Sequence, residues 1–222
     1  MSKRKKNPKS PKKQSAPKKQ GGKTWILCAA AVLLLGVIGL TVWLALRSRG
    51  ESTVYRAGDY QFTLRTEGEA VIVAYVGEET RLTIPSTLAG HPVTAIGPYA
   101  FYEKTFLREV VIPESVTEIG YQAFACCDKL ADMTIPDGVN AVGNCAWIGT
   151  PWLERHPDSF VIVGQGILVG YRGTERCVTL PAGVRCVSTA FFDCGTVEEV
   201  ILPEGVAEIG ELAFYGAAAL EK

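Results

Sequence analysis

The stretch Val110–Leu130, VVIPESVTEIGYQAFACCDKL, aligns almost residue for residue with Val200–Leu220, VILPEGVAEIGELAFYGAAAL. Both contain an apolar-x-apolar-Pro start, a later valine, an Ile-Gly pair, an Ala-Phe pair and a leucine six residues after the phenylalanine. The same frame begins again at Leu82, Met133 and Val178. A unit this short cannot bury its own apolar side chains, so it must stack on copies of itself. The sequence therefore predicts a solenoid.

The prolines of the frame give its period. They are Pro85, Pro113, Pro136, Pro181 and Pro203, with spacings of 28, 23, 45 and 22. The two short spacings lie within the range of leucine-rich units. The spacing of 28 contains an insertion, Leu88–His91, and the spacing of 45 contains one repeat plus an additional segment. We expect about five repeats over residues 81–222, with a hairpin inserted near 149–172 and packed against the stack by Pro151-Trp152-Leu153.

Each repeat should form a short parallel strand that ends at its proline, because proline cannot donate to the ladder. Alternation along the strand predicts the inward pairs Leu82/Ile84, Val110/Ile112, Met133/Ile135, Val178/Leu180 and Val200/Leu202. The rest of each unit should cover that face through Val116/Ile119, Val139/Val142, Val184/Val187 and Val206/Ile209. An aromatic column is predicted at Phe101, Phe124, Trp147, Phe191 and Phe214.

The turn before each aromatic residue should depend on glycine. Gly97, Gly120, Gly143 and Gly210 are predicted to adopt positive φ. The fourth repeat is one residue short at this place, in Val187–Ala190, so its turn should differ.

The frame apolar-x-Ile-Pro-x-x-Val-x-x-Ile-Gly-x-x-Ala-Phe-x-x-Cys-x-x-Leu resembles the BspA-type leucine-rich repeat family of bacterial surface proteins. The resemblance covers about 82–220, although the column cysteine is missing from the first, third and fifth repeats. It implies an extracytoplasmic recognition or adhesion scaffold without catalytic residues. The expected fold is a β-rich leucine-rich repeat solenoid of short parallel strands and turns or short helical turns.

The residues before the repeats predict a cap and an anchor. Residues 55–80 alternate like two strands and should form a β-hairpin that covers the first repeat, since an exposed solenoid end needs a polar-faced cap. Residues 47–54 read as a linker. Residues 24–46 hold 23 uncharged residues, long enough for one transmembrane helix. A cleaved signal peptide is the rival reading, but its apolar region would be shorter and followed by small residues.

Charge divides the chain into two unlike parts. Residues 1–23 carry ten basic side chains and no acid, whereas residues from Glu51 onward carry eleven basic and 23 acidic side chains. The basic excess places the N-terminus in the cytoplasm and the repeats outside the cell membrane. The tail, residues 1–23, should be disordered and attract anionic membrane lipid. No nucleic-acid partner is expected, because the tail lacks interleaved aromatic residues for base stacking.

Residues that could carry chemistry are few. Cys127 and Cys194 follow the column aromatic at a fixed distance and should be small buried side chains. The disulfide state of Cys126, Cys145, Cys177 and Cys186 stays open, with a Cys177–Cys186 bond as one alternative. The two histidines, His91 and His156, are expected in solvated loops. We therefore expect no enzyme activity, no metal site and no cofactor.

The outward strand positions remain as the candidate binding face. It comprises Thr83, Glu109, Val111, Asp132, Thr134, Thr179, Glu199 and Ile201. Threonine and valine also suit exposed β positions without any binding role. Two functions fit: a membrane-anchored module that binds protein or glycan at the cell surface, or a structural envelope protein that forms homo-oligomers through its open C-terminal repeat.

Overall fold

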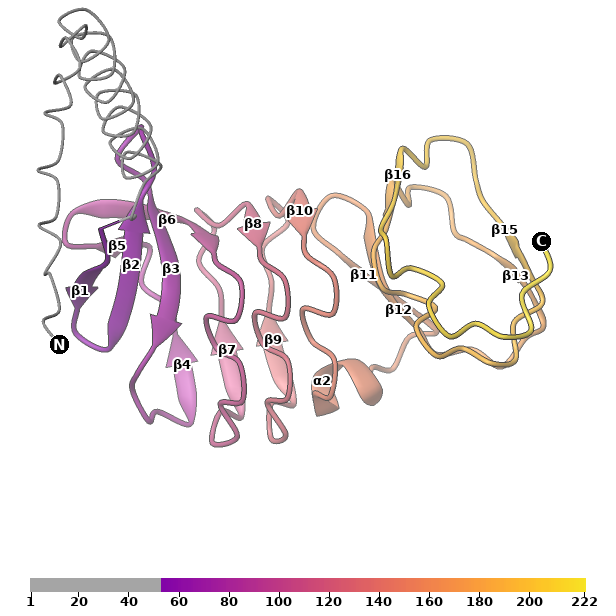
Figure 1. Cartoon of the computed structure of the whole chain (residues 1–222), viewed down its shortest axis with the longest axis horizontal. Helices are drawn as coiled ribbons and strands as arrows, with labels where there is room; N and C mark the ends of the chain where they lie inside the picture. The colour runs from indigo at the N-terminus through magenta and orange to yellow at the C-terminus, as the bar shows by residue number, and fades with distance from the viewer. Residues whose placement is uncertain (1–52) are drawn as a thin grey trace, which may run out of the picture. The chain divides into compact units, whose positions relative to one another are not determined.

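A computed structural model describes residues 53–222, which lie within one compact unit, Ser52–Lys222. Its coils are built from two rows of short parallel strands (Figure 1). The strands that end before the repeat prolines are β4 (Arg81–Thr83), β7 (Glu109–Val111), β9 (Asp132–Thr134), β13 (Cys177–Thr179) and β15 (Glu199–Ile201). The second row contains β3 (Ala70–Tyr75), β6 (His91–Ile96), β8 (Glu118–Ile119), β10 (Ala141–Val142), β12 (Ile167–Tyr171), β14 (Cys186–Val187) and β16 (Glu208–Ile209).

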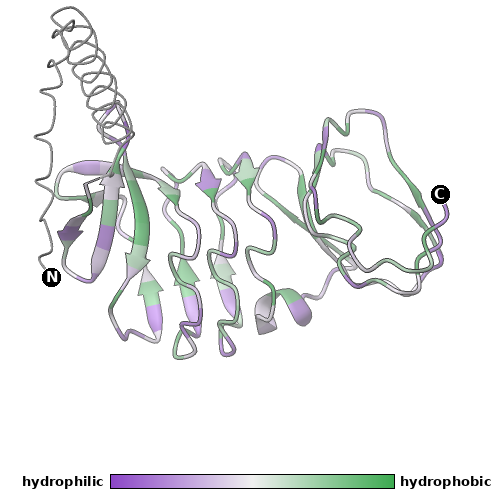
Figure 2. Cartoon of the chain, in the orientation of Figure 1, coloured by the Kyte–Doolittle hydropathy of each residue, from purple (hydrophilic) through white to green (hydrophobic). Residues whose placement is uncertain are grey.

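Alternation sets which side chains enter the core. Arg81, Glu109 and Asp132 pair with one another along the first row, and the next residues Leu82 and Val110 point inward and are buried. Figure 2 shows β4 and β7 with hydrophilic colour where they begin and hydrophobic colour beyond. The predicted inward pairs are thus correct for the first repeats, because a strand in contact with solvent on one face keeps a period of two.

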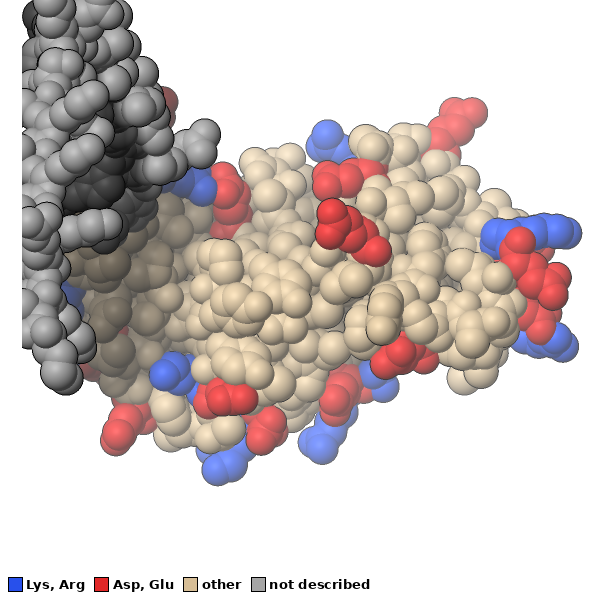
Figure 3. Space-filling model, viewed as in Figure 1, with Lys and Arg blue, Asp and Glu red and all other residues tan. Residues whose placement is uncertain are grey.

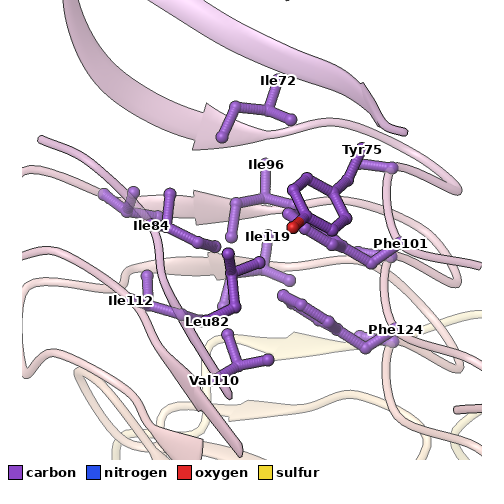
Figure 4. Packing of buried hydrophobic residues seen from close by; sticks show 14 of the residues in the cluster. Ile72, Tyr75, Leu82, Ile84, Ile96, Phe101, Val110, Ile112, Ile119 and Phe124 are labelled. Atoms are coloured by element: carbon purple, nitrogen blue, oxygen red, sulfur yellow. The ribbon is translucent and has the colours of Figure 1, made fainter. Parts of the chain in front are cut away.

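The predicted aromatic column forms as two stacked phenylalanine pairs, whereas the Trp147 ring packs beside the Trp152 ring, with centroids 5.2 Å apart. The Phe101 and Phe124 rings stack with centroids 4.9 Å apart, and the Phe191 and Phe214 rings with centroids 5.2 Å apart. Figure 4 shows Phe101 above Phe124, beside the aliphatic side chains of the two strand rows. Each coil therefore adds one aromatic ring and several aliphatic side chains to one of two hydrophobic cores. Each large side chain contributes about 1.5–3 kcal/mol when fully buried.

The prediction of positive φ at Gly97, Gly120, Gly143 and Gly210 was wrong, since none of them has that conformation. These glycines are needed because neighbouring coils approach closely. A Cβ on Gly120 would lie 2.5 Å from the Pro98 nitrogen. The left-handed residue follows two positions later, at Tyr99, Gln122 and Cys145. The shortened fourth turn, residues 188–190, has no such residue, so it differs as predicted.

Three antiparallel strands precede the first coil. β1 (Tyr55–Ala57) pairs with β2 (Tyr60–Leu64), and β2 pairs with β3. β3 then pairs in parallel with β6, so this hairpin is continuous with the second strand row. β5 (Thr87–Leu88) pairs with the start of β6 and forms the small hairpin that accounts for the insertion in the first repeat. A protective role for the β2–β3 hairpin stays a prediction.

A joint divides the solenoid at residues 149–172. The segment forms the short helix α2 (Pro151–Glu154) and the antiparallel pair β11 (Phe160–Val163) and β12. β12 is buried on both faces: Ile167 and Val169 belong to the core of the first coils, and Leu168 to the core of the last coils. In Figure 1 the first coils are seen from the side and the last coils nearly along their axis, so the solenoid axis bends at this joint.

The two blocks begin in the same way. Residues 70–85, AVIVAYVGEETRLTIP, match residues 166–181, GILVGYRGTERCVTLP, with Tyr75 and Tyr171 at equivalent places. Each tyrosine donates its backbone N–H to the alanine before the next column phenylalanine, Ala100 or Ala190. Each ring also packs beside that phenylalanine. The hairpin predicted between repeats is therefore present in the 149–172 segment, and it starts a second block of coils.

The last coil has no further coil stacked on it within the described residues. Leu202 and Ile209 are 41% and 49% exposed, whereas Ile119, equivalent to Ile209, is 2% exposed. Leu202 and Ile209 were predicted to be buried, but they stay partly exposed. The reason is that a side chain of a solenoid is covered by the next coil, and no further coil covers these two within the described residues.

The predicted cytoplasmic tail, residues 1–23, the transmembrane segment, residues 24–46, and most of the linker, residues 47–54, lie outside the described residues. Within residues 53–222, no helix has both the length and the apolarity needed to cross a membrane.

Candidate binding surfaces

The eight residues of the predicted binding face lie on the strands of the first row. Thr83, Val111 and Thr134 stand opposite one another on β4, β7 and β9, beside Glu109 and Asp132. Thr179 pairs with Ile201 on β13 and β15, two residues along β15 from Glu199. The joint separates the first five residues from the last three. The structure thus brings the predicted face together as two patches rather than one.

The first patch carries more acidic than basic side chains. An Arg81 guanidinium nitrogen lies 3.6 Å from a Glu109 carboxylate oxygen, and Asp132 pairs with Glu109 on the next strand. Carboxylates directly opposite each other on a sheet repel. This patch therefore carries one guanidinium group beside an acidic row of two carboxylates, Glu109 and Asp132, and a basic side chain of a partner would offset its excess negative charge.

A shallow groove of about 430 Å³ follows the outer side of the second strand row. Its floor includes the small residues Ala95 and Ala141. At one end, Arg65 donates two hydrogen bonds to the Glu118 carboxylate, one of them 2.9 Å long. These hydrogen bonds hold the pKa of Glu118 below its usual value. Arg65 follows β2, so this ion pair connects the starting hairpin with the second coil.

Three tyrosines gather on the turns of the first two coils. The Tyr99 ring lies edge-on to the Tyr102 and Tyr121 rings, with centroids 5.7 and 5.4 Å away. Tyr99 is 51% exposed. In Figure 3 the middle of the visible face is uncharged, with charged side chains above and below it. Tyrosine combines an apolar ring with a polar tip and is common at interfaces, so these turns are a further candidate contact surface.

The six cysteines of the described residues are free thiols. Cys127 is fully buried and donates to the Phe101 carbonyl oxygen at 3.1 Å, as expected for a small core side chain. Burial raises the pKa of this thiol to about 12. Cys177 lies on β13, where its thiol is 3.4 Å from a Glu199 carboxylate oxygen, and Cys186 lies on β14 in a different sheet. The alternative of a Cys177–Cys186 disulfide is therefore wrong for this fold.

The histidines lie in different parts of the fold. His91 was expected in a solvated loop, but it starts β6 and its Nδ1 atom lies 2.7 Å from the Gly68 carbonyl oxygen. His156 follows α2 and its ring meets the Trp152 ring edge-on. Within residues 53–222, no three His, Cys, Asp or Glu residues gather as metal ligands would.

A cavity of about 170 Å³ lies at the joint. One wall is the third turn, from Cys145 to Gly149, and the other is the short fourth turn around Thr189 and Phe192. Leu153 of α2 and Val169 of β12 contribute apolar side chains to the lining. Glu154 and Arg172 also line it and have opposite charges. Trp147 lines it as well, and its indole N–H is buried with no hydrogen-bond partner among the described residues.

Comparison with known families identifies the repeats. The model described as "BspA type Leucine rich repeat region" matches residues 79–154 and 174–222 with six copies, one more than the five frames counted from the sequence. The chain belongs to this family. The two matched ranges begin close after Tyr75 and Tyr171, in agreement with two blocks that start alike.

Two solved structures are similar to this BspA-type chain. A leucine-rich cell surface protein from Faecalibacterium prausnitzii A2-165 is 27% identical, with a TM-score of 0.51 over 78% of this chain. The match covers 54% of that protein, so this chain spans about half its length. A leucine-rich repeat protein from T. pallidum is also 27% identical, with a TM-score of 0.50 over 77% of this chain and 92% of that protein. No curated protein matches the chain.

Sequence reasoning missed the joint of this BspA-type solenoid. The signal was present, because Tyr75, Gly77 and Glu79 recur as Tyr171, Gly173 and Glu175 with a constant separation of 96 residues. A Cβ on Gly77 would lie 2.6 Å from the Tyr75 ring, so the glycine lets the tyrosine fold back over the chain. Comparing whole segments rather than the repeat frame alone would have found the second start.

Proposed function

We propose that this protein is a membrane-anchored, extracytoplasmic module that binds a protein or glycan partner at the bacterial cell surface without catalysis. The observation that carries the proposal is the regular outward face of β4, β7 and β9, where equivalent residues of successive coils stand side by side. Solenoids use such extended faces for binding. Membership of a family with a solved cell-surface relative supports the location.

The N-terminal segments complete the proposal. Residues 24–46 would anchor the chain, residues 1–23 would lie in the cytoplasm against anionic lipid, and the β2–β3 hairpin would shield the first coil. Protease shaving of intact cells tests this topology: loss of residues 53–222 with protection of the tail is expected. A repeat domain that survives shaving of intact cells but is digested after lysis would contradict it.

Charge reversal tests the binding face. The variant Glu109→Lys, Asp132→Lys, Glu199→Lys should lose crosslinked partners on intact cells, because it removes the acidic row of the first patch and the acidic group of the second. A matched control, Glu114→Lys, Asp137→Lys, Glu204→Lys, makes the same charge change at exposed positions that lie after the strands. If both variants capture every partner as the unmodified chain does, the strand face is not the binding surface.

Self-association through the last coil is the second candidate, and the exposure of Leu202 and Ile209 favours it. The variant Leu202→Lys, Ile209→Lys should convert oligomers to monomers in sedimentation, because it places charge on the apolar end. Ile162→Lys is a control at an apolar residue of similar exposure on β11. Oligomers that persist in the double variant would exclude this interface.

A further inference from the structure

The cavity at the joint lies beside hydrogen-bonding groups that the regular stack would satisfy. In the second coil, the N–H groups of Phe124 and Cys126 donate to Ala146 and Ile148 of the third coil at 2.8 and 2.9 Å. The equivalent donors of the third coil are the N–H groups of Trp147 and Gly149. Among residues 53–222 neither has an acceptor. Trp147 is buried, and an orphaned N–H group on a buried residue is rare and costs free energy. Gly149 is exposed, so solvent reaches its N–H group.

The reason is the change of direction at the joint. The side chain of Leu153 packs against Gly170, where its Cδ1 atom would lie 2.8 Å from an added Cβ. Gly170 occupies the place of the alanine whose carbonyl oxygen would otherwise accept from the Trp147 N–H. Only Cys145 finds a substitute acceptor, the Thr189 hydroxyl, at 3.2 Å. The third turn therefore presents two free backbone donors, at alternate residues, to the cavity that Trp147 and Gly149 line.

A third donor lies on the same residue. Trp147 is 1% exposed, and its indole N–H has no partner within the described residues. Two donors without a protein acceptor thus belong to one buried residue that lines the cavity, and an occupant with hydrogen-bond acceptors would satisfy them. Donors at alternate residues suit a chain in the extended conformation, as when a peptide adds to the edge of a sheet.

The size and lining of the cavity define the rest of the occupant. A volume of about 170 Å³ is close to that of an apolar protein cavity of about 150 Å³ that accepts benzene. The lining includes Ala146, Leu153, Val169 and Phe192. One leucine or phenylalanine side chain fits these surroundings. The donors at alternate residues favour a peptide over a sugar, because the carbonyl oxygens of an extended peptide recur at that spacing.

We propose that the joint cavity binds an extended peptide segment of a partner protein, which places one leucine- or phenylalanine-sized side chain in the cavity. The peptide carbonyl oxygens accept from the N–H groups of Trp147 and Gly149 and so replace the acceptors that a following coil would supply. This rests on the proposed function as a binding module, and it assigns protein rather than glycan to this site.

Two capped pentapeptides test the proposal with the full-length chain. The probes are Ac-Ser-Ala-Leu-Ala-Ser-NH2 and the same peptide with glycine at the centre, measured by calorimetry. The leucine peptide should bind at least tenfold more tightly, and it should slow hydrogen exchange of the Gly149 amide. Equal affinity, no binding at millimolar peptide, or unchanged exchange at Gly149 would each overturn the proposal.

A variant locates the site. Ile148→Trp enlarges a half-buried residue that lines the cavity and should weaken the leucine peptide at least tenfold, whereas Val76→Trp, an exposed position on the N-terminal side of the first coil and outside the cavity lining, should leave binding unchanged. Equal effects of the two variants would also overturn the proposal. If Ile148→Trp does not fold, the peptide comparison and the Gly149 exchange still decide.

The outcome is separable from that of the strand-face experiment. Loss of partner capture in the charge-reversed variant concerns β4, β7, β9 and β15, all outside the cavity. The peptide can therefore fail to bind at the joint while the strand face still captures partners. Conversely, the peptide can bind at the joint while charge reversal on the strand face changes nothing.

Discussion

Replacing Gly143 by alanine tests why the repeat requires glycine. In this structure Gly143 does not have positive φ, but an added Cβ would lie 2.6 Å from the Gly120 carbonyl carbon and 2.7 Å from the Tyr121 Cα. Both neighbours are backbone atoms of the previous coil, so they cannot rotate away. The two coils must separate for the alanine to fit.

The expected cost follows from three contributions. Overpacking against fixed atoms costs about 1–3 kcal/mol. Separation also weakens the bonds from the Gly143 N–H to the Ile119 carbonyl oxygen, 2.7 Å, and from the Gln122 N–H to the Asn144 carbonyl oxygen, 3.1 Å. Each such bond contributes about 1 kcal/mol. In the opposite direction, alanine lowers the conformational entropy of the unfolded chain, which stabilises the folded state by about 0.4–1 kcal/mol. The free energy of unfolding should therefore fall by roughly 2–4 kcal/mol.

Gly138→Ala in the same repeat is the matched control. Gly138 lacks positive φ, and its nearest atom to an added Cβ is the Glu114 carbonyl oxygen, an ordinary contact at 3.7 Å. This variant should be neutral or slightly stabilising through the unfolded state. Thermal denaturation followed by circular dichroism should place Gly143→Ala roughly 4–16 °C below the unmodified protein, since 1 kcal/mol shifts the midpoint by about 2–4 °C at this size. If the midpoints of the two variants agree within experimental error, close approach of the coils is not the reason for the glycine.

Three further outcomes are expected. Phe124→Ala should lower the free energy of unfolding by about 3–5 kcal/mol in chemical denaturation, because the ring is fully buried in the column. The folded-state pKa of Cys127 is about 12, above the value of about 8.5 for an unfolded cysteine, so its neutral thiol stabilises fully below about pH 8.5 and loses that contribution toward pH 12. Cys127→Ala should reduce this alkaline loss, measured as stability against pH. Arg65 lowers the pKa of Glu118, so the ion pair stabilises the fold above about pH 4.3, and this contribution is lost as the pH falls through the folded-state pKa. Because the pair is partly exposed, Glu118→Gln should lower the free energy of unfolding by less than about 1 kcal/mol. The same variant should remove the acid dependence of stability that comes from this pair.

Prediction from sequence succeeded where the reason was local or periodic. Val110 and Phe124 could be placed inside because the same residue types recur at fixed spacing, and only one face of a short strand can be buried. Prediction failed at Gly120, because a glycine can relieve either an unusual φ or a close approach of two coils. The sequence at one position does not distinguish these two reasons for a glycine. They can be separated only when the position of the neighbouring coil is known.

The candidate surfaces show the same division. Glu109 and Asp132 could be assigned to one outward row from the period of the repeat. The interruption of that row before Thr179 could not, because it depends on β12 being buried on both faces. His91 was predicted in a solvated loop, but its ring nitrogen contacts the Gly68 carbonyl oxygen of the preceding hairpin. The repeat pattern does not include that hairpin, so it could not predict this contact.

The sequence by itself determined that the chain stacks repeats, since the frame around Val110–Leu130 leaves apolar side chains that only another copy can cover. It also determined the family, the inward positions and the aromatic column. The tertiary structure alone decided that the stack bends between its two blocks, because β12 is buried on both faces. It also decided that Trp147 and Gly149 face a cavity. The physical reason is that the repeat pattern specifies only how one coil packs on the next coil. A bend arises where two neighbouring coils do not pack in the regular way, and the pattern of one repeat does not record this.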